Sequence, residues 1–414
     1  MILFSNKARP YHLGPFPLER IARDAGLLGD EIGRARQARP AVPPAADSKF
    51  AAAVDKYHAI FHSLRADDPA PARAPVPDDL GRRAVDVKGA AYFLNASQVG
   101  ICEMPDLGWL EDAAPLQHSH AVVILVQHPR QPEEGSLAGD WVAGSIDAMA
   151  GFRAYEIGIS IANQVQKMGH SAIAHDVRHG DVDLERLAVM AGLCYRAGDR
   201  VLNPYLDDGF ALAVVTTDYP LATDLPLKPR AARKAKGVGY MLGLGGATSG
   251  LERWRQEKRA THLSKFAMET VDRVDRPTTL IIDDEVPRVP KRASFFDRAV
   301  HGDLGKKTQQ ERTRFAFKHP LAAAMVKQIM AMVPDQDGPV ADHASETCSD
   351  AEENTRALKS LSYLLGAELT GVCEIPDYAW YSHVDGGKPV ECRHKYAVVM
   401  LIDQEYDTME GASG

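Results

Sequence analysis

The stretch GICEMPD at residues 100–106 returns as GVCEIPD at residues 371–377, and a tryptophan follows each copy at the same distance. The flanks agree as well: residues 118–126 correspond to 394–402 after a small insertion, and three upstream positions match in each copy, Tyr92, Leu94 and Ala96 with Tyr363, Leu365 and Ala367. A period this long indicates two copies of a domain, because the units of a solenoid are far shorter. We therefore predict an internal duplication.

The two copies differ in the length of sequence after them. A long stretch continues beyond the first copy, whereas the chain ends at Gly414, soon after the second match. We therefore expect the second copy to be truncated and the sequence to be the front part of a longer protein.

Composition narrows the class of protein. The chain has 414 residues, of which 45% are hydrophobic, so it can bury real cores. Lys plus Arg is 48 and Asp plus Glu is 56, and the net charge of −8 argues against general nucleic-acid binding. The five cysteines are too scattered for a disulfide framework, and no signal-length or membrane-length apolar run occurs. We predict a cytoplasmic protein with neither a nucleic-acid nor a membrane partner.

Alternating helical and strand patterns predict an α/β or α+β layer structure. We divide the chain into a leader and linker (1–84), of which residues 38–79 are expected to pack loosely, a first repeat (85–227), a connector (228–350) and the start of a second repeat (351–414). The equivalent cysteines Cys102 and Cys373 are expected to be buried. We expect buried strands at 121–126 and 397–402, and further strands at 101–102 and 210–217. Helices are expected at 50–64, 85–94, 153–168, 184–194, 251–258 and 320–333, the last of them packed as core.

Two segments contain polar or charged residues of the kind that form sites. In the connector, aromatic and cationic residues alternate near position 295, and we select Phe295, Phe296 and Arg298 as the lining of a pocket for an anionic substrate. The alternative is that the phenylalanines pack the connector onto a domain while the arginines are solvated. Between two helices of the first repeat lie His175, Asp176, Arg178, His179 and Asp181. These residues are interpreted either as an acid–base cluster or as an ordinary polar loop.

Cofactor motifs are missing from the sequence. No two cysteines have the spacing of an iron–sulfur ligand run, and His383, Cys392 and His394 fit no standard zinc spacing, so we predict no metal site. The glycine-rich residues 237–250 follow no strand pattern and lack the acidic residue of a dinucleotide-binding fingerprint. Two further glycine–lysine pairs lack the frame of a phosphate loop.

Several spaced motifs nevertheless agree with one family. The opening NKARPYHLGPFP at residues 6–17, and a series running from AGL at 191–193 through LNP at 202–204 to TDYPL at 217–221, resemble the catabolic, cytoplasmic reductive dehalogenases. A similar layout occurs, more distantly, in epoxyqueuosine reductases.

The resemblance implies a nitroreductase-like fold and a cobalamin-dependent reductive dehalogenase acting on halogenated phenols or hydroxybenzoates, supplied by an electron-donor protein or reductase. The first repeat of the chain would then be a vestigial cobalamin-domain copy, and the second repeat would be the start of the cobalamin-binding copy. Two [4Fe–4S] clusters would bind in the sequence beyond it. Tyr155 would then be the vestigial counterpart of a proton-donating tyrosine, the alternative being a plain helix residue at a domain surface. The catalytic residues are expected beyond Gly414, so this segment alone should be inactive, hold no cluster and bind cobalamin weakly or not at all.

Two alternative functions stay open. The chain fits a non-catalytic binding or assembly protein derived from the same family by truncation. It also fits an epoxyqueuosine-reductase-like enzyme. The duplication argues against that family, whose members look like proteins with a single copy of the domain.

Overall fold

The structure is a computed structural model that describes residues 9–42, 46–66, 68–272, 274–275, 279–280, 282, 285–384 and 386–403. The first residues of the opening motif at 6–17 and the C-terminal residues 404–414 lie outside the described residues.

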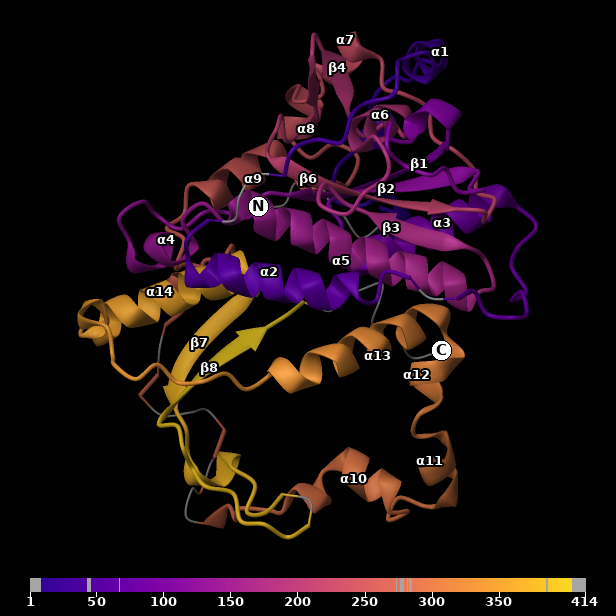
Figure 1. Cartoon of the computed structure of the whole chain (residues 1–414). Coiled ribbons are helices and arrows are strands. Elements are labelled where there is room, and N and C mark those ends of the chain that lie inside the picture. The colour runs from indigo at the N-terminus through magenta and orange to yellow at the C-terminus, as the bar shows by residue number, and fades with distance from the viewer. Residues whose placement is uncertain are drawn as a thin grey trace.

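A four-stranded antiparallel sheet forms the centre of the fold (Figure 1). Its strands lie in the order β1 (Gln98–Glu103), β2 (His120–Gln127), β6 (Phe210–Thr217) and β3 (Ala172–His175). The three longer strands confirm the sequence prediction, whereas β3 was not predicted, because four residues are too short for a periodic signal. The chain is thus a mixed helix and sheet protein, as expected.

The sheet is buried on both faces, which explains its continuous apolar runs. Along β2, Ala121, Val123 and Leu125 belong to the core on one face, while Val122 and Ile124 belong to the core on the other. This alternation follows from the two-residue period of a strand. Each face is therefore covered by other elements.

Three helices cover one face: α5 (Ile146–Lys167), α3 (Leu80–Phe93) and α2 (Lys49–His62). Helix α5 begins seven residues before the predicted start, behind Ser145, and carries the apolar stripe through Ile157 and Ile161. Helix α2 lies along α5 (Figure 1), and its Phe61 is only 1% exposed. The expectation that residues 38–79 pack loosely was therefore wrong for α2, because its apolar face completes this core.

The other face is covered by shorter pieces, among them α6 (Leu184–Met190), which is shorter than the predicted 184–194, and α1 (Leu27–Ile32). A small hairpin, β4 (Tyr195–Ala197) with β5 (Arg200–Leu202), packs beside them. Helix α4 (Leu137–Val142) precedes α5. The short 3₁₀ helices are Tyr11–Leu13, Leu18–Arg20, Asp106–Gly108, Met268–Thr270, Lys291–Ala293, Val333–Asp335, Glu346–Cys348 and Asp377–Ala379.

The later part of the chain contains the same elements as α3, β1 and β2, in the same order: α14 (Ala351–Leu364), β7 (Leu369–Glu374) and β8 (Tyr396–Leu401). Asp350 caps α14 as Asp79 caps α3, each accepting two backbone N–H groups. Cys373 pairs with Ala397 in the register in which Cys102 pairs with Ala121. The strand positions predicted at 397–402 are thus essentially as expected.

One detail is shared by both hairpins. The Tyr92 hydroxyl accepts the backbone N–H of Val99 at 3.1 Å, and the Tyr363 hydroxyl accepts that of Thr370 at the same distance. A tyrosine near the end of a helix therefore fixes the start of the following strand in both segments.

Burial differs between the two hairpins. Ala121 and Ile124 on β2 are completely buried, whereas Val399 on β8 is 49% exposed and Leu401 is 56% exposed. Cys373 is exposed although Cys102 is buried. The predictions that residues 397–402 form a buried strand and that Cys373 is buried were wrong, because β8 has β7 as its only strand partner within the described residues, whereas β2 lies between β1 and β6.

The connector runs from α7 to α13 as short helices. Figure 1 shows α10 and α11 far from the central sheet, with α13 returning along the underside of α5. Ala324 and Gln328 of α13 are buried and most of its other residues are partly buried, so the prediction that this helix packs as core holds for one face, while Ile329 and Met330 are exposed. The bounds are Pro229–Ala232 (α7), Val238–Met241 (α8), Gly250–Glu257 (α9), Phe295–Val300 (α10), Lys306–Glu311 (α11), Arg314–Lys318 (α12) and Pro320–Met332 (α13).

Among the described residues, no helix combines the length and the apolarity that a membrane crossing needs.

Candidate functional site

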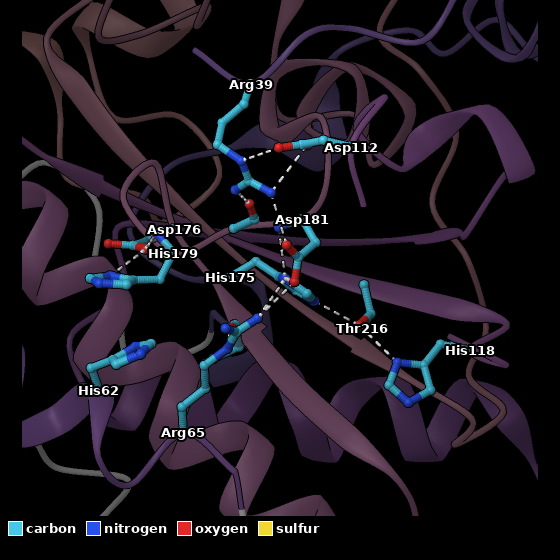
Figure 2. Close-up of polar contacts among 12 residues, drawn as sticks. Arg39, His62, Arg65, Asp112, His118, His175, Asp176, His179, Asp181 and Thr216 are labelled. Atoms are coloured by element: carbon cyan, nitrogen blue, oxygen red, sulfur yellow. Dashed lines mark hydrogen bonds and ion pairs between the residues drawn. The ribbon is translucent and has the colours of Figure 1, made fainter. Parts of the chain in front are cut away.

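Polar residues gather where β3 ends, in the loop that leads to α6 (Figure 2). The sequence had singled out five residues of this loop, between His175 and Asp181. The structure adds side chains from four distant segments: His58, His62 and Arg65 from α2 and the residues just after it, Tyr155 from α5, and Arg39 and Asp112 from two surface loops. The loop is therefore one wall of a larger polar site.

One half of the site, which we call the histidine cluster, consists of His58, His62, Tyr155, Asp176 and His179. His58 Nε2 donates a hydrogen bond to Asp176 Oδ2 at 2.7 Å, and Asp176 Oδ1 accepts the backbone N–H of His179 at 2.7 Å. The His179 ring stacks on that of His62, with 3.9 Å between centroids. His62 Nδ1 lies 2.9 Å from the Tyr155 hydroxyl.

Burial determines the protonation of the cluster. It is the largest influence on the pKa of both His62 and His179, and it lowers the pKa of each, with nearby cationic or imidazole groups adding to the effect. Burial works to raise the pKa of Asp176, but the hydrogen bonds from His58 and from the His179 backbone outweigh it and lower the pKa overall. Two neutral imidazoles therefore lie beside an ionised carboxylate.

Tyr155 is completely buried, and this burial raises the pKa of its phenol. The hydroxyl therefore keeps its proton and lies within hydrogen-bond distance of His62 Nδ1. A phenol closed off in this way cannot reach a substrate. Its position on α5, predicted from the family resemblance to be that of a vestigial counterpart of a proton donor, is here part of a packed network.

The other half of the site surrounds His175, which is completely buried at the end of β3. Its Nε2 lies 2.9 Å from Thr216 Oγ1, and its Nδ1 accepts the backbone N–H of Asp181 at 3.2 Å. Asp181 in turn accepts hydrogen bonds from Arg65 at 3.2 Å and from Arg39 at 3.1 Å (Figure 2). Arg39 also binds Asp112, so this chain of ion pairs runs from the core to the surface.

The environment of His175 disfavours its charged form. Burial, with the nearby Arg65 guanidinium, lowers the pKa of His175 to about 3. Burial also works to raise the pKa of Asp181, but the hydrogen bonds from Arg39 and Arg65 lower it. His175 is thus a neutral hydrogen-bonding residue that ties β3 to β6, and the histidine cluster is the half of the site able to hold a ligand.

The sequence reasoning missed His58 and His62, which it had assigned to a leader segment. A signal was present, because a spacing of four residues places two side chains on the same helix face. The loop residues Asp176 and His179 are spaced by three. Only the packing of α2 on α5 brings the two pairs together, and that packing joins segments more than a hundred residues apart.

The residues selected as a substrate pocket lie elsewhere, on α10. Phe295 and Phe296 are 64% and 65% exposed and meet edge to face with 5.6 Å between centroids. The Arg298 side chain is exposed and makes no hydrogen bond or ion pair with another described residue. The structure therefore places the three residues together but does not bring them to the histidine cluster.

The remaining candidates are spread over the surface. Residues 237–250 form α8, the start of α9 and glycine turns between them. Cys348, Cys373 and Cys392 are exposed, while Cys102 and Cys194 are buried, and burial raises the pKa of both buried thiols. Among the described residues, the five cysteines do not come together as the four thiolate ligands of a [4Fe–4S] cluster. These residues therefore do not fit such a cofactor.

Comparisons with known proteins identify the chain more specifically. No protein-family model and no curated protein matches it. Among solved structures, the catabolic reductive dehalogenase NpRdhA matches with a TM-score of 0.89 and 41% identity, covering 100% of this chain. The same enzyme in complex with 3-bromo-4-hydroxybenzoic acid matches with a TM-score of 0.88 and 42% identity. Another match, at 41% identity, is a reductive dehalogenase structure described as suggesting a mechanism for B12-dependent dehalogenation.

The chain spans 59% of the length of these dehalogenases. Epoxyqueuosine reductases match with TM-scores of only 0.24 and 0.25, which are too low to support a shared fold or function. With 41% identity along its whole length and the same three-dimensional arrangement, the chain belongs to the family of catabolic reductive dehalogenases.

Proposed function

We propose that the chain is the N-terminal portion of a reductive dehalogenase that removes halogen from halogenated phenols or hydroxybenzoates. The observation that carries the proposal is the match to NpRdhA over the whole chain, one structure of which contains 3-bromo-4-hydroxybenzoic acid. Replacing an aryl halogen by hydrogen consumes two electrons and a proton and releases halide, so the enzyme needs a redox cofactor. An electron-donor protein or reductase supplies the electrons.

We propose that cobalamin and two [4Fe–4S] clusters bind in the part of the enzyme beyond residue 414. The description of one matching structure as B12-dependent supports the corrinoid. The described residues of this chain do not supply a cluster's ligands, so we assign none of them to a cofactor and predict that the 414-residue chain is inactive alone. A cytoplasmic location remains a prediction.

The organisation that we propose is a duplication: a leader (1–84), a vestigial first repeat (85–227), a connector (228–350) and the start of a cobalamin-binding second repeat (351–414), each repeat with a nitroreductase-like fold. The matched registers of the β1–β2 and β7–β8 hairpins support it. So do the matched aspartate caps and the matched tyrosine hydrogen bonds.

The β7–β8 hairpin borders a cavity of about 480 Å³ between it and the connector. Gly371 and Leu401 line the cavity, and no heavy atom lies within 4 Å of where a Gly371 side chain would begin. At the equivalent position of the first repeat, Gly100 packs directly against Ala191 and Leu193. We propose that the rest of the second repeat covers this open face of the hairpin.

We further propose that Phe295, Phe296 and Arg298 line the substrate pocket of the complete enzyme. Two exposed aromatic rings and a cation that makes no hydrogen bond or ion pair with another described residue are suited to a halogenated phenolate or carboxylate. Among the described residues, Phe295 and Phe296 contact each other and stay largely exposed, so both rings are accessible to a ligand.

Arg298→Ala in the longer enzyme should raise KM for 3-bromo-4-hydroxybenzoic acid by roughly tenfold or more, with a smaller change in kcat. A guanidinium that pairs with a carboxylate binds substrate and transition state alike, so its loss appears mainly in KM. Steady-state halide release measures both constants.

The control for that experiment is Lys307→Ala, which removes an exposed cation from the neighbouring helix α11. Its kinetics should equal those of the parent enzyme. Unchanged kinetics in Arg298→Ala would remove α10 from the substrate pocket.

A further inference from the structure

We propose that His58, Asp176 and His179 form a binding site for a divalent transition-metal ion, with zinc as the expected occupant. Each residue offers one ligand atom, and the three atoms lie within 4.8 Å of one another. Two imidazoles and a carboxylate suit zinc, cobalt, nickel or copper better than magnesium or calcium, which prefer oxygen alone. The site lies outside the substrate pocket proposed on α10 and does not depend on it.

The spacing is close to that of a tetrahedral site. Zinc ligands at about 2.0–2.1 Å from the metal are separated from one another by roughly 3.3 Å. His58 Nε2 and Asp176 Oδ2 are 2.7 Å apart, and His179 Nδ1 lies 3.7 Å from Asp176 Oδ1. The two separations involve different oxygens of Asp176, so rotation of the carboxylate and of the two imidazole rings would bring one oxygen and both nitrogens to this spacing.

One ring nitrogen of the third ligand is left without a hydrogen bond by the fold. His179 Nδ1 is buried and has no hydrogen-bond partner among the described residues, although it points toward the Asp176 carboxylate. Leaving a buried polar atom unpaired destabilises the folded state. A metal ion placed between the carboxylate and this nitrogen would satisfy it.

The surroundings hold the three ligands in place. The backbone N–H of His179 fixes Asp176 Oδ1, and the His62 ring, held by Tyr155, stacks against the His179 ring. Such outer contacts orient metal ligands in proteins. His58 and Asp176 are each 3% exposed, whereas the His179 side chain is 38% exposed. Three protein ligands with solvent on one side leave the fourth position open to water.

The consequence of occupancy depends on where the ligands lie. His58 is on α2, whereas Asp176 and His179 follow β3. A bound ion would therefore link α2 to the end of the central sheet. Because it binds the folded state, it would stabilise that state by mass action.

The test is a titration of the purified chain with Zn²⁺ and, separately, with Co²⁺, in a variant that carries Cys348→Ser, Cys373→Ser and Cys392→Ser. These exposed thiols would otherwise compete for metal. We expect one ion per chain by calorimetry, a higher Tm with zinc, and a cobalt spectrum free of thiolate charge transfer. Affinity should fall below neutral pH, because imidazole ligands must be unprotonated.

Two matched variants decide the assignment. His179→Phe keeps a ring stacked on His62 but removes one ligand, and it should weaken binding by about 100-fold or more. His301→Phe removes an exposed imidazole at the end of α10, outside the histidine cluster, and it should bind as the parent does. The metal-free Tm of each variant shows that it is folded. No binding by the parent, or equal binding by the parent and His179→Phe, would overturn the proposal.

Discussion

Gly100→Ala should destabilise the chain by about 1–3 kcal/mol or more, as expected for a group forced into a packed core. A Cβ built at Gly100 falls closer than 3.0 Å to the backbone oxygen of Ala191, and it also crowds Leu193. Backbone cannot yield as a flexible side chain does, and Gly100 lies in β1, paired with Val123. Urea unfolding followed by circular dichroism measures the change.

The equivalent substitution in the second segment should behave differently. Gly371→Ala meets nothing within 4 Å, so in the 414-residue chain it should leave stability unchanged within about 0.5 kcal/mol or raise it slightly. In the longer enzyme, where we propose that the second repeat is complete, Gly371→Ala should become destabilising like Gly100→Ala. An equal and small effect of Gly371→Ala in both contexts would contradict the proposal that the two hairpins are covered alike.

Acidification should cost stability through His175. Its pKa is lowered to about 3 in the folded chain, against an ordinary value near 6.5 in the unfolded chain. The unfolded chain therefore binds more protons in this range, and the contribution of His175 to stability is complete above pH 6.5 and is lost as the pH falls toward 3. Between pH 7.5 and 5.0 the expected loss from this residue is about 2 kcal/mol.

The variant His175→Gln separates this contribution from those of other groups. Glutamine does not titrate, yet it offers an amide donor toward Thr216 and an acceptor toward the Asp181 backbone. The variant should be less stable than the parent at pH 7.5, but its free energy of unfolding should fall by about 2 kcal/mol less on going to pH 5.0. Parallel pH profiles would show that His175 is already charged in the folded chain.

The sequence was sufficient for the elements whose signal is local. Helices α2 and α5 were located from their helical patterns, because a face buried by a regular element leaves a regular pattern, while α13 and the strand at Phe210–Thr217 were located from composition and from a continuous run. Strand β3 has only four residues and left no such pattern.

Burial was harder to infer than position. Residues 397–402 are as apolar as residues 121–126, and both were expected to be buried, yet Val399 and Leu401 are largely exposed. Apolar side chains indicate that a strand can be buried. Whether it is buried depends on elements from other parts of the fold that pack against it. Cys373 is exposed for the same reason, although its strand register equals that of Cys102.

The histidine cluster shows the same limit for a site. The loop from His175 to Asp181 was noticed because its polar residues are neighbours in sequence. His58 was not, since its hydrogen bond to Asp176 joins residues 118 positions apart. Long-range packing of this kind leaves no periodicity, so only the folded structure could bring these ligands together.

Halide release from 3-bromo-4-hydroxybenzoic acid tests the central proposal most directly. The assay compares the 414-residue chain with a version extended through the second repeat and its cluster-binding region, each supplied with cobalamin and a strong reductant under anoxic conditions. We predict bromide and 4-hydroxybenzoic acid in equal amounts from the extended enzyme and none from the 414-residue chain. Turnover by the 414-residue chain, or no turnover by an extended enzyme that holds both cofactors, would contradict the proposal.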